Sequence, residues 1–360
     1  MTYKIPETCR MGVLTKAHTL ELVTLPLPEI GEDEVLIKHE TCNICTTDYG
    51  QWLGKREHQG YPMAGGHEGS GIVIAKGAKV GDELQIGDRV GLTYAYCGVC
   101  KACRLGEQIA CVDRDKLLSY TAKSPFGYYG THGFSDYFIR PARYLIKMNP
   151  DLDPTEAGFL EPVATVVNGI HKLRLKPMEL AVVIGGGTMG LINAQVARAF
   201  GARVIVSEPM AHKRKCAEEM GFTVIDPSAA DPVAQIKTLS DGKGADTVIV
   251  VVGTTEANDQ ALQMVKHLDG RILLFAAGFP VPELNIDSNE MHYRKLELIG
   301  AFEANQKDFY DAATLLNNRQ IDVKPLISGK FPLDEIEQAF ADASVPGKFR
   351  VALDLWGDGE

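Results

Sequence analysis

The spacing of apolar positions changes twice along the chain and divides it into three parts. Residues 1 to about 155 carry short alternating or β-branched runs, such as 34–39 (EVLIKH) and 71–75 (GIVIA), separated by turns rich in Gly, Pro and Asp. A period of two is typical of half-buried strands. The first part is therefore predicted to be mainly β.

From about 160 to 300, continuous apolar runs alternate with segments of helical spacing. This alternation indicates βαβ units in a doubly wound parallel sheet, so the fold class is α/β. The predicted strands are 182–184, 203–207, 247–252 and 271–276, and the predicted helices are 194–200, 212–220 and 257–268. The third part is predicted to form helices at 307–317 and 333–343 and a strand at 349–355.

Length and charge narrow the class of protein. A chain of 360 residues is longer than a single core usually extends, so we expect two domains. The formal charge of -10 argues against a nucleic-acid partner. No apolar run approaches the roughly 20 residues of a membrane span, and the first residues lack the apolar core of a signal peptide. We expect a soluble, cytoplasmic protein without a membrane partner.

A glycine-rich turn follows the first strand of the parallel sheet, in the stretch 182–190 (VVIGGGTMG). In the spacing G-x-G-x-x-G, Gly185 permits a tight turn, Gly187 lets the backbone approach a pyrophosphate, and Gly190 allows close helix packing. The helix start at Thr188 and Met189 offers free N–H groups to phosphates. An ordinary strand turn is the alternative for this motif on its own.

The cofactor type depends on the end of the next strand. Glu208 lies about 20 residues beyond the glycines, where a carboxylate accepts the ribose hydroxyls of NAD and repels the extra phosphate of NADP. Lys213, with His212 and Arg214, forms a basic patch that tolerates such a phosphate, and a solvated helix start is the alternative. We expect NAD, with NADP less favoured.

Four of the eight cysteines gather within fifteen positions and predict a structural zinc site. Cys97, Cys100, Cys103 and Cys111 have a spacing that closes a tetrahedral shell and leaves no position for substrate. Accidental clustering of structural cysteines is the alternative, and it predicts no bound metal.

A second set of donors leaves a coordination position open. Cys45, His67 and a carboxylate, from Glu68 or Glu161, form a Zn²⁺ ligand set of the catalytic kind. A redox pair of Cys42 with Cys45 is the alternative, but that motif needs a following helix in a βαβ setting, which we do not expect here. The alternative role for Glu161 is that of an acidic residue in the first turn of a helix, where a negative charge is favoured.

Several motifs in order resemble the zinc-dependent medium-chain alcohol and polyol dehydrogenases, nearest the sorbitol and threonine dehydrogenase branches. The matching segments are 45–48 (CTTD), 66–68 (GHE), the four-cysteine lobe, 134–137 (FSDY), 160–162 (LEP), the glycine turn, 331–335 (FPLDE) and 339–340 (AF). The resemblance implies a GroES-like catalytic domain at 1–157 with a zinc lobe at 95–113, a Rossmann domain at 158–299, and a segment at 300–360 that completes the catalytic domain.

The resemblance also implies roles for individual residues. Cys45 and His67 would bind a catalytic zinc, Thr47 would take the proton of the substrate alcohol, and Asp48 would orient a ligand histidine. The zinc would lower the pKa of the alcohol, whose hydride passes to nicotinamide. The residues implied near the nicotinamide are Val252, Gly253, Gly300, Ala301 and Phe302. A homodimer or homotetramer follows by analogy alone.

The chain departs from the family pattern at three positions. Asn43 stands where the family usually has Gly, and Gly50 replaces a His that often relays the proton. The proton must then leave by another route, for which ribose and water are the candidates. Glu303 stands where the sorbitol branch tends to carry Arg, which puts a plain polyol substrate in doubt.

The loop 49–61 is expected to border the substrate. Trp52 is a candidate wall of the pocket, and Lys55, Arg56 and His58 are candidates to meet an anionic group, with solvated loop charges as the alternative. We expect a secondary alcohol on a polyol, sugar acid or phosphorylated polyol, with a ketone as product. The alternatives are a threonine 3-dehydrogenase-like enzyme, with Glu303 facing the ammonium, and a zinc and nucleotide-binding protein without turnover.

Overall fold

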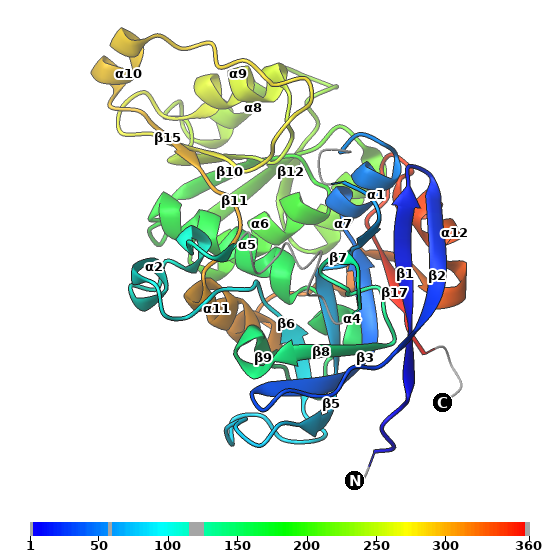
Figure 1. The fold of residues 1–360 in the computed structure, drawn as a ribbon. Coiled ribbons are helices and arrows are strands. Elements are labelled where there is room, and N and C mark those ends of the chain that lie inside the picture. The colour runs from blue at the N-terminus through cyan, green and yellow to red at the C-terminus, as the bar shows by residue number, and fades with distance from the viewer. Residues whose placement is uncertain (1–2, 57–59, 115–125, 357–360) are drawn as a thin grey trace. The chain divides into compact units, whose positions relative to one another are not determined.

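The computed structural model describes residues 3–56, 60–114 and 126–356, which fold into two compact units (Figure 1). The β-rich unit consists of Met1–Ala164, Ala304–Arg319 and Val323–Glu360, and the parallel-sheet unit of Thr165–Glu303 with Gln320–Asp322. The sequence predicts breaks after residues 157 and 299, whereas the packing places them after Ala164 and Glu303. Each unit is built from a different strand pattern.

The larger sheet of the β-rich unit joins strands from both ends of the chain. Its order is β16 (Ile327–Pro332), β17 (Arg350–Asp354), β3 (Glu34–Ile44), β5 (Glu68–Lys76), β6 (Arg89–Leu92) and β9 (Leu145–Lys147), and β8 (Tyr137–Pro141) also pairs with β3. Val351 lies opposite Ile44 and Asp354 opposite Thr41 in an antiparallel ladder. The C-terminal segment therefore completes the sheet that begins near the N-terminus.

The β-rich unit also contains a second sheet and several helices. The sheet has the order β2 (Thr19–Pro26), β1 (Thr8–Lys16), β4 (Met63–Ala64) and β7 (Tyr129–Gly130), and its hairpin β1–β2 is drawn in blue in Figure 1. The helices of this unit include α1 (Thr46–Trp52), α2 (Lys101–Arg104), α11 (Gln306–Asn317), α12 (Ile336–Ala343) and the start of α5 (Leu160–Leu173). The short α4 (Pro154–Ala157) also belongs to this unit. Phe134 and Phe340 pack edge to face in its core at a centroid distance of 5.3 Å.

The parallel-sheet unit is a doubly wound sheet of six strands. Their order is β12 (Thr223–Ile225), β11 (Arg203–Ser207), β10 (Leu180–Ile184), β13 (Thr247–Val250), β14 (Arg271–Leu274) and β15 (Glu297–Gly300), and every pair is parallel. The helices are α6 (Thr188–Ala199), α7 (Ala211–Glu219), α8 (Pro232–Leu239), α9 (Thr255–Met264) and α10 (Ser288–Arg294). The strand order reverses between β10 and β13, which is where ligands bind in such sheets.

The predicted α/β fold class is confirmed. Most observed element boundaries differ from the predicted ones by a few residues. The helix predicted at 194–200 begins earlier, at Thr188, directly after the glycine turn. The helix predicted at 333–343 is split into a 3₁₀ turn, Leu333–Glu335, followed by α12. Among the described residues, no helix has the length and apolarity needed to cross a membrane.

Candidate active site

Helix α1 places three of the candidate catalytic side chains. Cys45 is the N-cap residue, and the Asp48 carboxylate accepts the Cys45 N–H through Oδ2 at 2.9 Å. The other carboxylate oxygen, Oδ1, accepts the Gly66 N–H at 3.3 Å and lies 3.7 Å from Nδ1 of His67. Asp48 thus joins the helix that carries Cys45 to the turn that carries His67. The Thr47 hydroxyl lies 3.9 Å from the Cys45 sulfur.

Three donors of the kinds that zinc prefers come together at this point. One ligand atom each from Cys45, His67 and Glu68 lies within 4.8 Å of the others. Glu68 is 1% exposed at the start of β5, and apart from an ion pair between its Oε1 and Arg350, its carboxylate oxygens have no hydrogen-bond partner. A buried carboxylate without such partners is costly unless a cation compensates it. The thiolate, imidazole and carboxylate therefore fit a zinc ion with a fourth position left for substrate.

One such cation is Arg350, the first residue of β17. Its Nη2 forms an ion pair with Oε1 of Glu68 at 2.9 Å, and the side chain is buried. The two come from opposite ends of the chain and meet because β17 and β5 both pair with β3. Sequence reasoning missed Arg350. The available signal was a cation at the start of the apolar strand 349–355, where a buried charge requires a partner.

The charges of this cluster shift one another's pKa values. Burial alone would raise the pKa of Cys45, but the charges of Arg350 and His67 outweigh it and lower the pKa to about 7. Burial favours neutral His67, yet Asp48 and Cys45 raise its pKa well above the usual range. Burial raises the pKa of Glu68 in spite of Arg350. A thiol that ionises near neutral pH is suited to bind a metal.

Glu161 lies beside this cluster, in the first turn of α5. Its carboxylate is 7% exposed and adds to the electrostatic field at His67, Glu68 and Arg350. It is not among the donors that approach within 4.8 Å of one another. The Tyr94 hydroxyl, which sequence reasoning did not single out, donates a hydrogen bond to Oε1 of Glu161.

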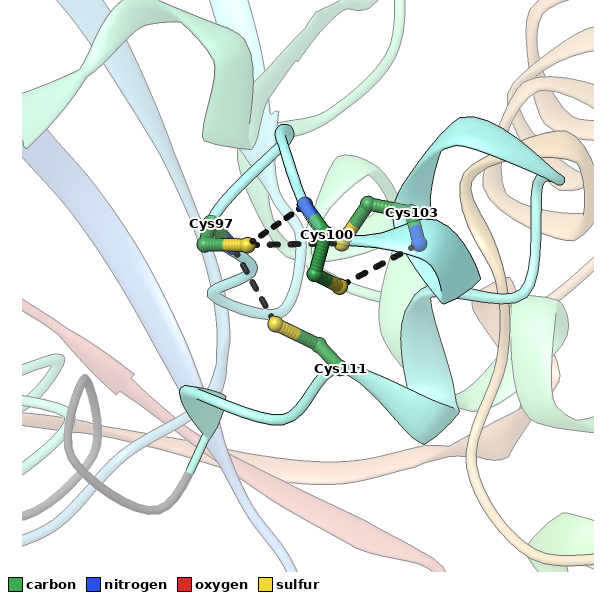
Figure 2. A group of neighbouring side chains, drawn as sticks. All are labelled: Cys97, Cys100, Cys103 and Cys111. Atoms are coloured by element: carbon green, nitrogen blue, oxygen red, sulfur yellow. Dashed lines mark hydrogen bonds between the residues drawn. The ribbon is translucent and has the colours of Figure 1, made fainter.

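The four cysteines of the lobe form a separate group of donors (Figure 2). Their sulfur atoms lie within 4.8 Å of one another. Backbone N–H groups point at the sulfurs: Cys97 donates to Cys111 at 3.3 Å, Cys100 to Cys97 at 3.3 Å, and Cys103 to Cys100 at 3.5 Å. The N–H bonds from Cys103 and Val112 lower the pKa of Cys100 to about 6. Four thiol groups in this arrangement fit a closed tetrahedral zinc site.

The glycine turn of the parallel-sheet unit has the geometry of a phosphate cradle. Gly185 has a φ of 108°, and Gly187 is the N-cap of α6. A Cβ on Gly190 would lie 1.8 Å from the Gly185 carbonyl oxygen, so only glycine fits there. The helix begins at Thr188 and Met189, and the N-terminus of a helix directs backbone N–H groups toward a bound phosphate. Val252 packs against the turn, because a Cβ on Gly185 would meet its Cγ2 at 2.7 Å.

Glu208 closes the other side of this turn. Its Oε2 accepts the Gly186 N–H at 2.6 Å and its Oε1 accepts the Met210 N–H at 2.8 Å. Of the nearby cations, Arg214 is paired with Asp226 at 2.7 Å, whereas Nζ of Lys213 lies 3.7 Å from the position of a Cβ on Gly187. The carboxylate and one lysine thus both face the predicted nucleotide site.

The other residues implied near nicotinamide lie at the strand ends of the same unit. Gly253 packs against the backbone of Gly278, where a Cβ would find no space. The turn after β15 carries Ala301 and Phe302, and Phe302 is 73% exposed. Glu303 follows with a φ of 59°, and its carbonyl oxygen accepts a hydrogen bond from Nδ2 of Asn168 at 2.8 Å.

The segment 49–61 is not a loop throughout, as predicted, because its first residues, up to Trp52, belong to helix α1. Trp52 packs against Phe340 and His18 at centroid distances of 6.3 and 5.1 Å, so it belongs to the core of the β-rich unit, and its contact with substrate stays a prediction. Arg56 lies over Gly50: its Cδ and Nε are 3.4 Å from the position of a Cβ on that glycine. His58 lies outside the described residues.

The structure bears on the redox alternative for Cys42 and Cys45. Helix α1 follows Cys45. The setting is still not βαβ, because β3 pairs with β5, β8 and β17 in antiparallel ladders. Cys42 is fully buried in β3, where burial raises the pKa of its thiol well above the usual range. An inert buried thiol does not suit a redox pair.

Comparison with known proteins places these features in one family. Residues 31–150 match the alcohol dehydrogenase GroES-like domain and residues 188–318 match the zinc-binding dehydrogenase domain. The chain is 32% identical over 317 residues to the 2-dehydro-3-deoxy-L-galactonate 5-dehydrogenase of Pseudoalteromonas atlantica, covering 88% of this chain and 89% of that protein. It is 31% identical over 329 residues to the L-threonine 3-dehydrogenase of Bacillus velezensis, covering 89% and 90%.

The fold leads to the same family. A crystal structure from Sinorhizobium meliloti 1021, described as a zinc-binding dehydrogenase bound to NADP, superposes with a TM-score of 0.83 at 27% identity, covering 97% of this chain and all of that one. The domain matches and the relatives above 30% identity confirm the resemblance expected from the sequence motifs. This chain belongs to the family of zinc-binding alcohol dehydrogenases.

Proposed function

We propose that this protein oxidises a secondary alcohol on a sugar acid, polyol or phosphorylated polyol and transfers the hydride to NAD. The single observation that carries the proposal is the group formed by Cys45, His67 and Glu68, whose donor atoms lie within 4.8 Å of one another. The Thr47 hydroxyl lies next to it, 3.9 Å from the Cys45 sulfur. A mixed donor set with an adjacent hydroxyl provides both a metal site and a proton acceptor for an alcohol.

Each side chain has a defined part in this chemistry. When bound, zinc polarises the substrate hydroxyl and lowers its pKa, and nicotinamide accepts the hydride. Cys45, His67 and either Glu68 or Glu161 would hold the metal. The Thr47 hydroxyl would take the substrate proton while it releases its own proton toward ribose and water. Asp48 fixes the ring of His67 from its Nδ1 side, since metal-binding histidines need such a partner.

An anionic substrate is supported by the position of Arg56. Gly50 lies three residues after Thr47 on α1, so the two share one helix face. The side chain of Arg56 packs over Gly50 and thereby brings a guanidinium to that face. A guanidinium binds a carboxylate or phosphate through two parallel hydrogen bonds. Because the Pseudoalteromonas relative is named for a sugar acid, we favour a sugar acid among the three classes.

The preference for NAD is supported by Glu208. Two backbone N–H groups hold its carboxylate beside the glycine turn, where it would repel a 2′-phosphate. Lys213 acts in the opposite sense, and the Sinorhizobium structure contains NADP. We expect a higher kcat/KM with NAD than with NADP at saturating alcohol, and the reverse order would contradict this part of the proposal.

A substrate panel with the zinc-loaded protein tests the reaction. We expect NADH formation with sugar acids and weaker activity with neutral polyols of the same chain length. Activity on simple primary alcohols, with none on polyol-type compounds, would contradict the proposal. Higher activity on threonine would favour the alternative that the Bacillus relative supports, with Glu303 facing the ammonium. No turnover on any of these would favour the non-catalytic alternative. The homo-oligomer and the cytoplasmic location stay predictions.

A further inference from the structure

The carboxylate of Glu161 is held by a tyrosine that the family motifs do not include. Tyr94 comes two residues after the end of β6, and its hydroxyl donates to Oε1 of Glu161. This contact engages one of the two carboxylate oxygens of Glu161. A hydrogen bond to one oxygen of a carboxylate restricts its side-chain rotation, and side chains that orient ligands in this way tune a metal site.

Tyr94 is itself positioned by helix α11. Its ring packs edge to face against Phe309 at a centroid distance of 5.2 Å, and Phe309 is fully buried. The preceding residue, Thr93, accepts a hydrogen bond through Oγ1 from Nε2 of Gln306 at 2.9 Å. Both partners, Gln306 and Phe309, belong to the first turns of α11. The place of the Tyr94 hydroxyl therefore depends on where this helix begins.

The start of α11 is bound in turn to the four-cysteine lobe. The side-chain oxygen of Asn305, the N-cap of α11, accepts the Ile109 N–H at 3.0 Å. The side-chain oxygen of Gln108 accepts the Gln306 N–H at 3.3 Å. Gln108 and Ile109 lie in the 3₁₀ turn Gln108–Ala110, directly before the lobe ligand Cys111. All of these residues belong to the β-rich unit.

We propose that Tyr94 is a positioning residue for Glu161, and that it couples the four-cysteine lobe to the catalytic metal site through α11. The path runs from the 3₁₀ turn before Cys111 to the start of α11, then to Thr93 and Tyr94, and ends at the Glu161 carboxylate. The inference rests on the proposed function, because it assumes a metal at Cys45 and His67. It assigns the lobe a second effect besides holding its own loop together.

The variant Tyr94→Phe tests the first step of this path. It keeps the ring against Phe309 and removes only the hydroxyl. We expect kcat/KM to fall roughly 10- to 100-fold, as for other partners that orient metal ligands. With cobalt at the catalytic site, the visible absorption bands should shift, which a change in global stability alone would not produce. The control is Tyr96→Phe, which removes a nearby phenol that donates to the Arg143 carbonyl oxygen and should leave both readouts unchanged.

The variant Gln108→Ala tests the coupling to the lobe. It removes the contact to the Gln306 N–H while keeping all four cysteines, so we expect full lobe zinc and a cobalt spectrum shifted in the same direction as in Tyr94→Phe, by a smaller amount. Unchanged spectra in either variant would overturn the inference. A wild-type protein that neither binds the second metal nor oxidises any alcohol would instead overturn the proposed function, so the two failures are distinguishable.

Discussion

The β-rich unit contains two groups of metal donors that differ in chemistry and in how the chain builds them. The lobe takes four sulfurs from one stretch, Cys97 to Cys111, and its backbone N–H groups point back at those sulfurs. The other group combines the thiol of Cys45, the imidazole of His67 and the carboxylate of Glu68. Four thiolates close a zinc shell, whereas three mixed donors leave room for substrate.

The difference extends to the surroundings of each group. The mixed group has a hydroxyl, Thr47, near its sulfur and a buried carboxylate, Asp48, near its imidazole. It is also balanced by Arg350, which comes from the other end of the chain. The lobe depends on local backbone geometry, and the mixed group depends on the tertiary fold. Changes in the lobe should therefore affect stability more than turnover, and changes in the mixed group should affect turnover more than stability.

The largest effect is expected from Cys45→Ser. Loss of a thiolate ligand removes the metal's stabilisation of developing charge, which amounts to several kcal/mol, so turnover should fall about 1000-fold or more. Binding of NAD, measured by titration, should not change, because the glycine turn is built by the other unit. Turnover equal to wild type would refute the role of Cys45.

The second effect concerns the lobe and should appear in stability. Cys111→Ser removes one of four ligands, and we expect Tm to fall by on the order of 10 °C, corresponding to about 3 kcal/mol. Scanning calorimetry measures the change. The matched control is Cys216→Ser in α7, a buried cysteine outside both groups, which should shift Tm far less. Equal shifts in the two variants would remove the distinction between lobe and core cysteines.

A smaller effect is expected from Asp48→Asn. Asparagine retains an oxygen for the Cys45 N–H but removes the negative charge beside His67, so catalytic zinc affinity should fall roughly 10- to 100-fold. Competition with a chelator measures this affinity. Glu156→Gln is the control, because Glu156 caps α4 in the same way, by accepting the Asp153 N–H at 3.1 Å. If both variants lose the same zinc affinity, capping rather than charge explains the result.

The smallest effect separates substrate binding from metal chemistry. Arg56→Ala should raise KM for a sugar acid about 10-fold or more, because a charge-assisted hydrogen bond contributes about 1.5–3 kcal/mol. KM for the neutral polyol of equal length should change little. Lys79→Ala, which alters an exposed lysine paired with Glu32 and remote from the segment 49–61 in sequence, is the control. A similar rise in KM for the sugar acid and for the neutral polyol would show that Arg56 does not bind the anionic group.

The sequence predicted those features that depend on local patterns. Buried runs such as 182–184 and glycine spacing identify the parallel sheet and its turn, because both reflect backbone requirements within one short segment. Cys97 to Cys111 were recognisable for the same reason. Helix α1 was not expected, since its capping by Cys45 and Asp48 is visible only once the backbone turns. The roles of Tyr94 and Arg350 were not predicted, because their partners, Glu161 and Glu68, are distant in sequence.

The zinc content of the Cys45→Ser protein, measured per chain together with the wild type, tests the central claim most directly. The two groups of donors predict two zinc ions per wild-type chain. They predict one in the variant, which retains the lobe metal and the wild-type Tm within a few degrees but does not turn over. Two zinc ions in the variant, or loss of both, would contradict the assignment of separate catalytic and structural sites.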